Sequence, residues 1–130
     1  MISVLVPEVV WYKVRPLIEK AVKKYPDYGW TIEDVKDAVE KKELQLWIDE
    51  QEPNIAVLTK IVQQPHALQC WIWLAGGKLP YDWEKHLNDI ERWAKWLGCD
   101  YIMEQGREGW QKKLGWNRAY VVMQKRLKDA

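Results

Sequence analysis

Apolar positions recur with a helical period in three stretches of the chain. Val6–Tyr25 shows i, i+3, i+4, i+7 spacing, and Pro16 within it predicts either a kink or a break into two helices. Thr31 is a good N-cap for a second apolar stripe that continues to about Lys42. The third stripe is the cleanest; it begins at about Tyr81 and ends at Gly98, a typical C-terminal cap.

Between the second and third stripes the apolar period changes to two. Residues 44–48 alternate as in a half-buried strand, 55–62 are apolar on both faces as in a central strand, and Ala67–Leu74 continue the pattern. Because the turns between these runs are short, we expect an antiparallel meander. The stretch from Ala75 to Pro80 should end its last strand.

The remainder of the chain predicts a strand at 100–105, a short helix at 108–114 and a final strand at Ala119–Leu127. The strand, helix, strand unit from Ala67 to Gln105 should be a right-handed crossover with parallel strands. With a short initial strand at 2–5, the order is (β)ααβββαβαβ. We therefore expect an α/β (α+β) fold, a single domain over residues 1–130 with a mixed central sheet and helices on both faces.

Composition excludes several classes of protein. The net charge is only +1, so nucleic-acid binding is disfavoured, and no run is long and apolar enough for a membrane span. Two separated histidines and two cysteines, Cys70 and Cys99, offer no metal-ligand spacing, and the cysteines are expected as reduced buried thiols. The first residues carry no basic stretch and only a short apolar run, so we expect no signal peptide. We expect a cytoplasmic protein without metal.

Tryptophan is unusually frequent: the chain has ten Trp and no Phe. Most Trp residues fit core spacings and are expected to replace Phe and Leu in packing. Trp47, Trp93 and Trp96 fall off the main stripes and are candidates for an exposed interface with another protein.

The closing region carries the most specific motif, Gly106-Arg107-Glu108-Gly109-Trp110, followed by the run from Gln111 to Trp116. With the element order above, it resembles the GNAT superfamily of N-acetyltransferases over nearly the whole chain. Together with Leu74-Ala75-Gly76-Gly77, the motif is similar to small GNAT-like proteins that tailed phages and prophages encode near head and packaging genes. This resemblance implies a host-cytoplasmic protein of virion assembly, with phage structural proteins or a second copy as partners.

The resemblance also implies where acetyl-CoA would bind. GNAT enzymes hold its pyrophosphate with backbone N–H groups of a glycine-rich loop at a helix N-terminus. The corresponding candidates here are Leu74, Gly76, Gly77 and Lys78, but the glycine spacing departs from the family pattern and Pro80 removes one donor. A plain strand-to-helix turn is favoured over a phosphate site, so we expect no bound cofactor, with acetyl-CoA or CoA as the alternative.

The catalytic groups depart further from the family. Many GNAT enzymes have a Tyr acid four residues before the closing glycine, and that position is Gln111, which cannot act as an acid. Glu50, Glu52 or Glu104 could supply a base, although a solvated surface carboxylate is the favoured interpretation of each. No catalytic residue is assigned.

Two further residues of the closing motif are candidate contacts. Arg107 could bind an anion or a partner carboxylate, or it could stack on Trp110 and fix the turn.

The favoured function is then a non-catalytic GNAT-like component of virion assembly, and the alternative is a divergent acetyl-CoA-dependent N-acetyltransferase acting on an amine. One observation separates the two functions: the strands either part at Leu74 and leave an open cleft, or the side chain of Trp71 or Trp73 fills it.

Overall fold

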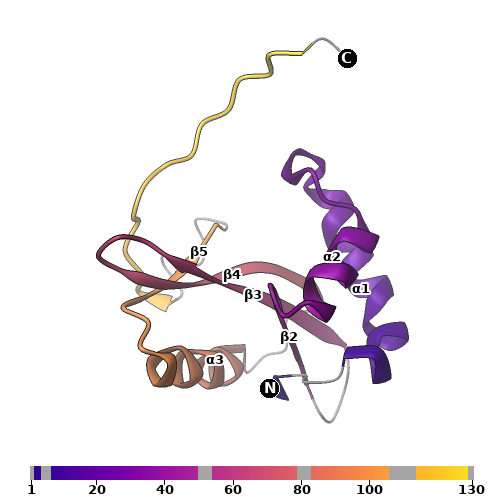
Figure 1. Ribbon diagram of the computed structural model, residues 1–130, viewed down its shortest axis with the longest axis horizontal. Coiled ribbons are helices and arrows are strands. Elements are labelled where there is room, and N and C mark those ends of the chain that lie inside the picture. Colours follow the sequence, from indigo (N-terminus) through magenta and orange to yellow (C-terminus); the bar gives the residue numbers. More distant parts are fainter. Residues whose placement is uncertain (1, 4–6, 50–53, 79–82, 106–113, 129–130) are drawn as a thin grey trace.

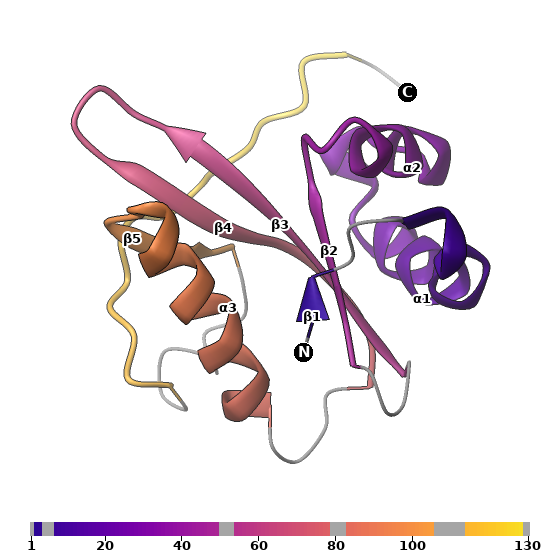
Figure 2. The same cartoon turned by 60° about the horizontal axis from the view of Figure 1, so that its bottom comes forward.

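A twisted five-stranded sheet separates two layers of helices (Figures 1 and 2). The computed structural model describes residues 2–3, 7–49, 54–78, 83–105 and 114–128. The strands occur in sheet order β1 (Ile2–Ser3), β2 (Gln45–Ile48), β3 (Ile55–Gln63), β4 (Leu68–Gly77) and β5 (Tyr101–Glu104). Helices α1 (Trp11–Lys24) and α2 (Ile32–Glu40) cover one face, α3 (Trp83–Leu97) covers the other, and short 3₁₀ turns lie at Pro7–Val9 (η1) and Pro26–Tyr28 (η2).

Helix α1 is continuous through Pro16, so of the two expected alternatives, a kink or a break, the break does not occur. A proline inside a helix leaves the carbonyl four residues earlier without its N–H donor. That residue is Tyr12, which is 70% exposed, so water can satisfy its carbonyl. The buried stripe of α1 lies on the opposite side and includes Val14 and Ile18.

The N-terminus of α2 confirms the predicted cap. The Thr31 hydroxyl accepts a hydrogen bond from the Asp34 backbone N–H, and the Asp34 carboxylate accepts one from the Thr31 N–H in return. The Thr31 N–H and the Thr31 hydroxyl both donate to the Asp34 carboxylate, and because they favour its charged form they lower the pKa of Asp34.

Strands β2, β3 and β4 form the expected antiparallel meander, and β4 pairs with β5 in parallel after the α3 crossover. Strand β4 continues to Gly77, past the predicted end at Leu74. It carries a bulge, since Leu58 faces Leu74 while Thr59 faces Ile72, which leaves Trp73 as the extra residue. Gly98 has φ of 90° and caps α3 as predicted, with the Cys99 N–H bonded to the Ala94 carbonyl.

Two apolar cores lie on the two sides of the sheet. One joins α1 and α2 to the sheet, and the other joins α3 to the opposite face, so β2 and β3 are covered on both sides. This corrects the expectation that Trp47 is exposed: it is 3% exposed and packs in the α3 core. Leu46 and Trp47 lie on opposite faces of β2. Because a core covers each face, both side chains are buried.

The expected final strand at Ala119–Leu127 does not form in this structure. The segment has no helix or strand assignment, and its residues are exposed along its length. A strand exists only through hydrogen bonds to a neighbouring strand, and this segment leaves the body of the molecule (Figure 1). The predicted short helix at 108–114 falls mainly outside the described residues.

Candidate functional site

Strands β4 and β5 pair over only part of the length of β4. Their parallel pairing runs from Gln69 opposite Tyr101 to Ile72 opposite Glu104, where β5 ends. From Trp73, its bulge residue, to Gly77, strand β4 continues without a paired strand on that side among the described residues. The last β4–β5 pair is therefore at the residue before the bulge, which bends β4 at this point.

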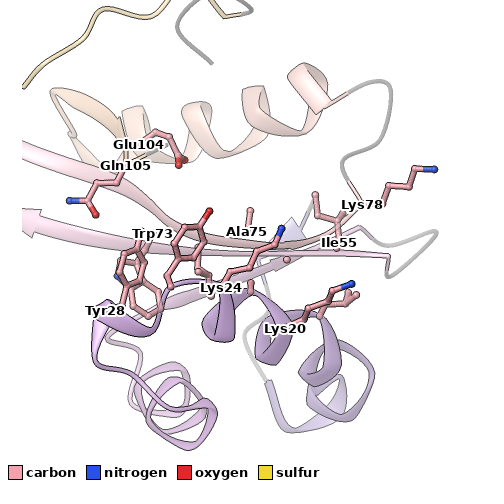
Figure 3. A pocket seen from close by; sticks show the side chains of 15 residues that line it. Lys20, Lys24, Tyr28, Ile55, Trp73, Ala75, Lys78, Glu104 and Gln105 are labelled. Carbon is pink, nitrogen blue, oxygen red and sulfur yellow. The ribbon is translucent and has the colours of Figure 1, made fainter. Parts of the chain in front are cut away.

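A cavity of 580 Å³ opens at the parting, within the size range of small-molecule sites. Figure 3 shows it between α1 and the ends of β4 and β5, with Lys20 and Lys24 across from Glu104 and Gln105. Its walls come from α1, η2, the start of β3 and the ends of β4 and β5: Leu17, Lys20, Ala21, Lys24, Tyr25, Tyr28, Ile55, Trp73–Lys78, Glu104 and Gln105.

Aromatic rings line one end of the cavity. Tyr28 stacks on Tyr25 with ring centroids 5.2 Å apart and lies 5.9 Å from Trp73. Trp73 also meets Trp30 edge-on at 4.9 Å. These contacts hold the Trp73 ring against η2, so that it forms a wall and the cleft remains open. Trp71 does not line the cavity; its ring lies 6.4 Å from that of Tyr120.

Glu104 is the most perturbed carboxylate at the cavity. Burial raises its pKa to about 8, because removal from water disfavours the charged form. Its Oε2 is fully buried and has no hydrogen-bond partner among the described residues. The expectation of a solvated carboxylate is therefore wrong for Glu104, whose Oε2 is shielded from water. Glu50 and Glu52, the other candidate bases, lie outside the described residues.

Tyr28 shares this environment with Glu104. Its pKa is raised mainly by burial and further by the charges of Tyr25 and Glu104. Tyr28 therefore stays a protonated phenol at neutral pH and can donate a hydrogen bond within the cavity.

Positive charge gathers at the cavity on the α1 side and at the end of β4. Lys20 and Lys24 lie one turn apart on α1, Lys78 follows β4, and all three line the cavity while remaining exposed. A cationic entrance attracts an anionic ligand.

All four predicted cofactor residues, Leu74, Gly76, Gly77 and Lys78, line this cavity. Close packing also accounts for the glycines at positions 76 and 77. A Cβ at Gly76 would lie 2.4 Å from the Leu17 carbonyl oxygen, and one at Gly77 would lie 2.0 Å from that of Asn54. Close packing therefore explains why these positions are glycine, and their role toward a phosphate stays a prediction.

The predicted contact residues are not brought together. Trp47 is buried and meets Trp93 edge-on at 5.2 Å, so neither forms the expected exposed platform, because both pack in the α3 core. Trp96 is 81% exposed. Arg107 and Trp110 lie outside the described residues.

Sequence reasoning missed four wall residues, Lys20, Lys24, Tyr28 and Trp73. The lysines are part of a helix rich in alternating charge, and Tyr28 lies in a predicted loop. Only the pairing register brings Trp73 to the cleft. None of the four has a sequence motif that could have identified it.

Other kinds of site are not supported in the described part of the chain. No three His, Cys, Asp or Glu side chains gather there in a way that could hold a metal ion. Cys70 and Cys99 are free thiols there, and burial raises the pKa of Cys70 to about 12. Of the helices that the structure describes, none is long and apolar enough to cross a bilayer.

Comparison with solved structures identifies the fold. A GNAT family acetyltransferase of Staphylococcus aureus matches with a TM-score of 0.60 and 19% identity, over 97% of this chain and 98% of that one. A protein solved as a probable acetyltransferase matches with a TM-score of 0.68 and 8% identity, over 99% and 98%. The BH1408 protein of Bacillus halodurans, solved as a tetramutant, matches with a TM-score of 0.67 and 17% identity, over 98% and 100%.

These likenesses show that the chain has the GNAT fold, as the sequence resemblance implied. No protein-family model matches the sequence, and no curated protein matches it either.

Proposed function

We propose that this protein transfers an acetyl group from acetyl-CoA to an amine, with Glu104 as the general base. The carrying observation is the buried carboxylate of Glu104, unpartnered among the described residues, on the wall of an open cavity where β4 and β5 part. The stability of the fold does not explain such a group, since a buried carboxyl without a partner destabilises the protein. A proton-transfer role does explain it.

The chemistry needs such a base. An amine at neutral pH is largely an ammonium ion, and it must lose a proton before its nitrogen can attack the thioester carbonyl. The new C–N bond then forms, the C–S bond breaks, and the departing thiolate takes up a proton from water. A carboxylate with a pKa of about 8 is well matched to accept the ammonium proton.

The cleft also suits the donor. Main-chain groups of β4 from Trp73 to Gly77 do not pair with β5 and can bond the amides of an extended ligand. Lys78, Lys20 and Lys24 supply positive charge for the CoA phosphates. The Tyr28 and Trp73 rings give the acceptor an apolar wall.

Calorimetry and a transfer assay test the proposal together. Wild-type protein should bind acetyl-CoA with micromolar affinity and acetylate members of an amine panel. Lys78→Glu should weaken CoA binding, whereas Lys36→Glu, the same charge change on α2 outside the cavity, is the matched control and should leave binding unchanged. Glu104→Gln should bind CoA normally yet lose about 10²–10⁴-fold in turnover. Absence of binding at millimolar acetyl-CoA would overturn the proposal.

The favoured sequence interpretation, a non-catalytic phage protein of virion assembly with protein partners, stays a prediction. The open cleft favours the enzymatic alternative over it, because the observable that was to exclude a cofactor, a cleft filled by Trp71 or Trp73, is not found.

A further inference from the structure

We propose that the acceptor is a free α-amino acid with an aromatic side chain, recognised through Lys24, Glu104 and the aromatic wall of the cavity. The aromatic wall consists of the rings of Tyr25, Tyr28 and Trp73. This inference rests on the proposed function, since it names the amine that would be acetylated. It follows from how positive charge, the carboxyl group and the rings are distributed around one cavity.

A cation and a carboxyl group face each other across the cavity without meeting. Figure 3 shows Lys24 on α1 across from Glu104 at the end of β5. Among the described residues, no charge adds to burial as a cause of the raised pKa of Glu104, so the charge of Lys24 does not reach this carboxyl. A ligand that lies between them can therefore meet both, with an amine toward Glu104 and an anionic group toward Lys24.

Lys24 belongs to the aromatic end of the cavity. It is the last residue of α1, and Tyr25 and the η2 turn with Tyr28 follow it directly. Lys78 lies at the end of β4, away from Tyr28 in Figure 3. Lys24 is therefore placed to bind an anionic group of the acceptor, while Lys20 and Lys78 remain for the CoA phosphates.

The aromatic wall favours a ring on the acceptor. Tyr28 and Trp73 are half-buried although they line the cavity, so part of each ring is accessible to a ligand. Contacts of these two rings with each other, with Tyr25 and with Trp30 hold them in place. A ring of the acceptor can pack on a surface that is already ordered, which lowers the entropic cost of binding.

An aromatic α-amino acid carries all three matching groups on one carbon atom. Its carboxylate meets Lys24, its amine meets Glu104 and its side chain meets the aromatic wall. In the transfer, the α-ammonium gives a proton to Glu104, and its nitrogen forms the C–N bond to the acetyl carbon. The C–S bond breaks, and the departing CoA thiolate takes up a proton from water.

Calorimetry with L-phenylalanine, in the presence and absence of CoA, tests this recognition in the wild-type protein. L-phenylalanine should bind about tenfold more tightly than L-alanine, which lacks the ring. It should bind about fivefold more tightly than phenethylamine, which lacks the carboxylate. The values of kcat/KM for acetyl transfer to these three amines should follow the same order.

A pair of neighbouring lysine variants tests the carboxylate contact. Lys24→Gln should weaken L-phenylalanine about fivefold and remove its advantage over phenethylamine, whereas a lost CoA contact would weaken both amines equally. Lys23→Gln is the matched control and should leave the preference unchanged. Lys23 adjoins Lys24 on α1, but it pairs with Glu19 at 3.5 Å and is not part of the cavity wall.

The failure of this inference can be told apart from that of the proposed function. Equal binding of the three amines would overturn the inference, and acetylation of other amines would then leave the proposed function in place. Selective binding of L-phenylalanine with no acetylation of any amine would overturn the proposed function and, with it, the acceptor role.

Discussion

The Trp47 indole Nε1 donates a hydrogen bond to the Thr59 hydroxyl at 3.0 Å, in the core beneath α3. The Thr59 hydroxyl in turn donates to the Gln45 side-chain oxygen at 2.9 Å. Thr59 is fully buried and lies directly opposite Gln45 in the β2–β3 ladder. One hydroxyl therefore satisfies two polar side chains of the neighbouring strand, which lets a Trp pack in a core without an unmet N–H.

Thr59→Val should lower the free energy of unfolding by about 1–3 kcal/mol, because the buried Trp47 N–H loses its acceptor while the side-chain shape is kept. Urea unfolding followed by Trp fluorescence measures this loss. Thr59→Ser keeps the hydroxyl and should restore the Trp47 hydrogen bond, at the smaller cost of one methyl group. Equal loss in both variants would show that the methyl group matters and the hydrogen bond does not.

Stability should fall as the pH rises from about 5 to about 8. Glu104 ionises near its ordinary pKa of 4.5 in the unfolded chain and at about 8 in the folded protein, so the folded state binds the extra proton between these values. Urea midpoints measured across this range check the slope. Glu104→Gln should flatten this part of the profile, and an unchanged slope in that variant would contradict the burial of the carboxyl.

Gly77→Ala should destabilise the protein by about 3 kcal/mol, since it combines a left-handed backbone with overpacking. The φ of Gly77 is 100°, and a Cβ would lie 2.0 Å from the Asn54 oxygen. Gly29→Ala is the matched control. Its φ of 75° is also left-handed, but no atom lies within 4 Å of the added Cβ, so its cost should be about 1 kcal/mol. Similar thermal midpoints for the two variants would contradict the close approach of β3 to β4.

If Glu104 is the base, kcat/KM for acetyl transfer should rise with pH until the carboxyl is ionised, with an apparent pKa of about 8. Initial rates at fixed acetyl-CoA, measured with an amine whose own pKa is well separated, check this. Glu104→Asp should keep a rising limb at reduced rate, whereas Glu104→Gln should remove it. An identical limb in Glu104→Gln would assign the titration to the amine.

Local signals predicted the local structure correctly. The Thr31 cap, the Gly98 cap and the stripe of α3 are each confirmed, because a cap or a stripe depends on residues within one or two turns. Pro16 is an exception. Its cost to helix stability depends on whether the carbonyl that it leaves unpaired is hydrated, and the choice of the buried face of α1 decides this.

The sequence by itself determined the helices, the meander and the parallel crossover, because periodicity and capping indicate which side chains must be buried. Tertiary structure alone decided which elements pack against those side chains. Trp47 is buried because α3 packs on the second face of the sheet, and Glu104 lines a cavity because it lies where the pairing of β4 with β5 ends. Residues 119–127 form no strand because hydrogen bonds between strands need a partner, and a partner is a property of the assembled sheet.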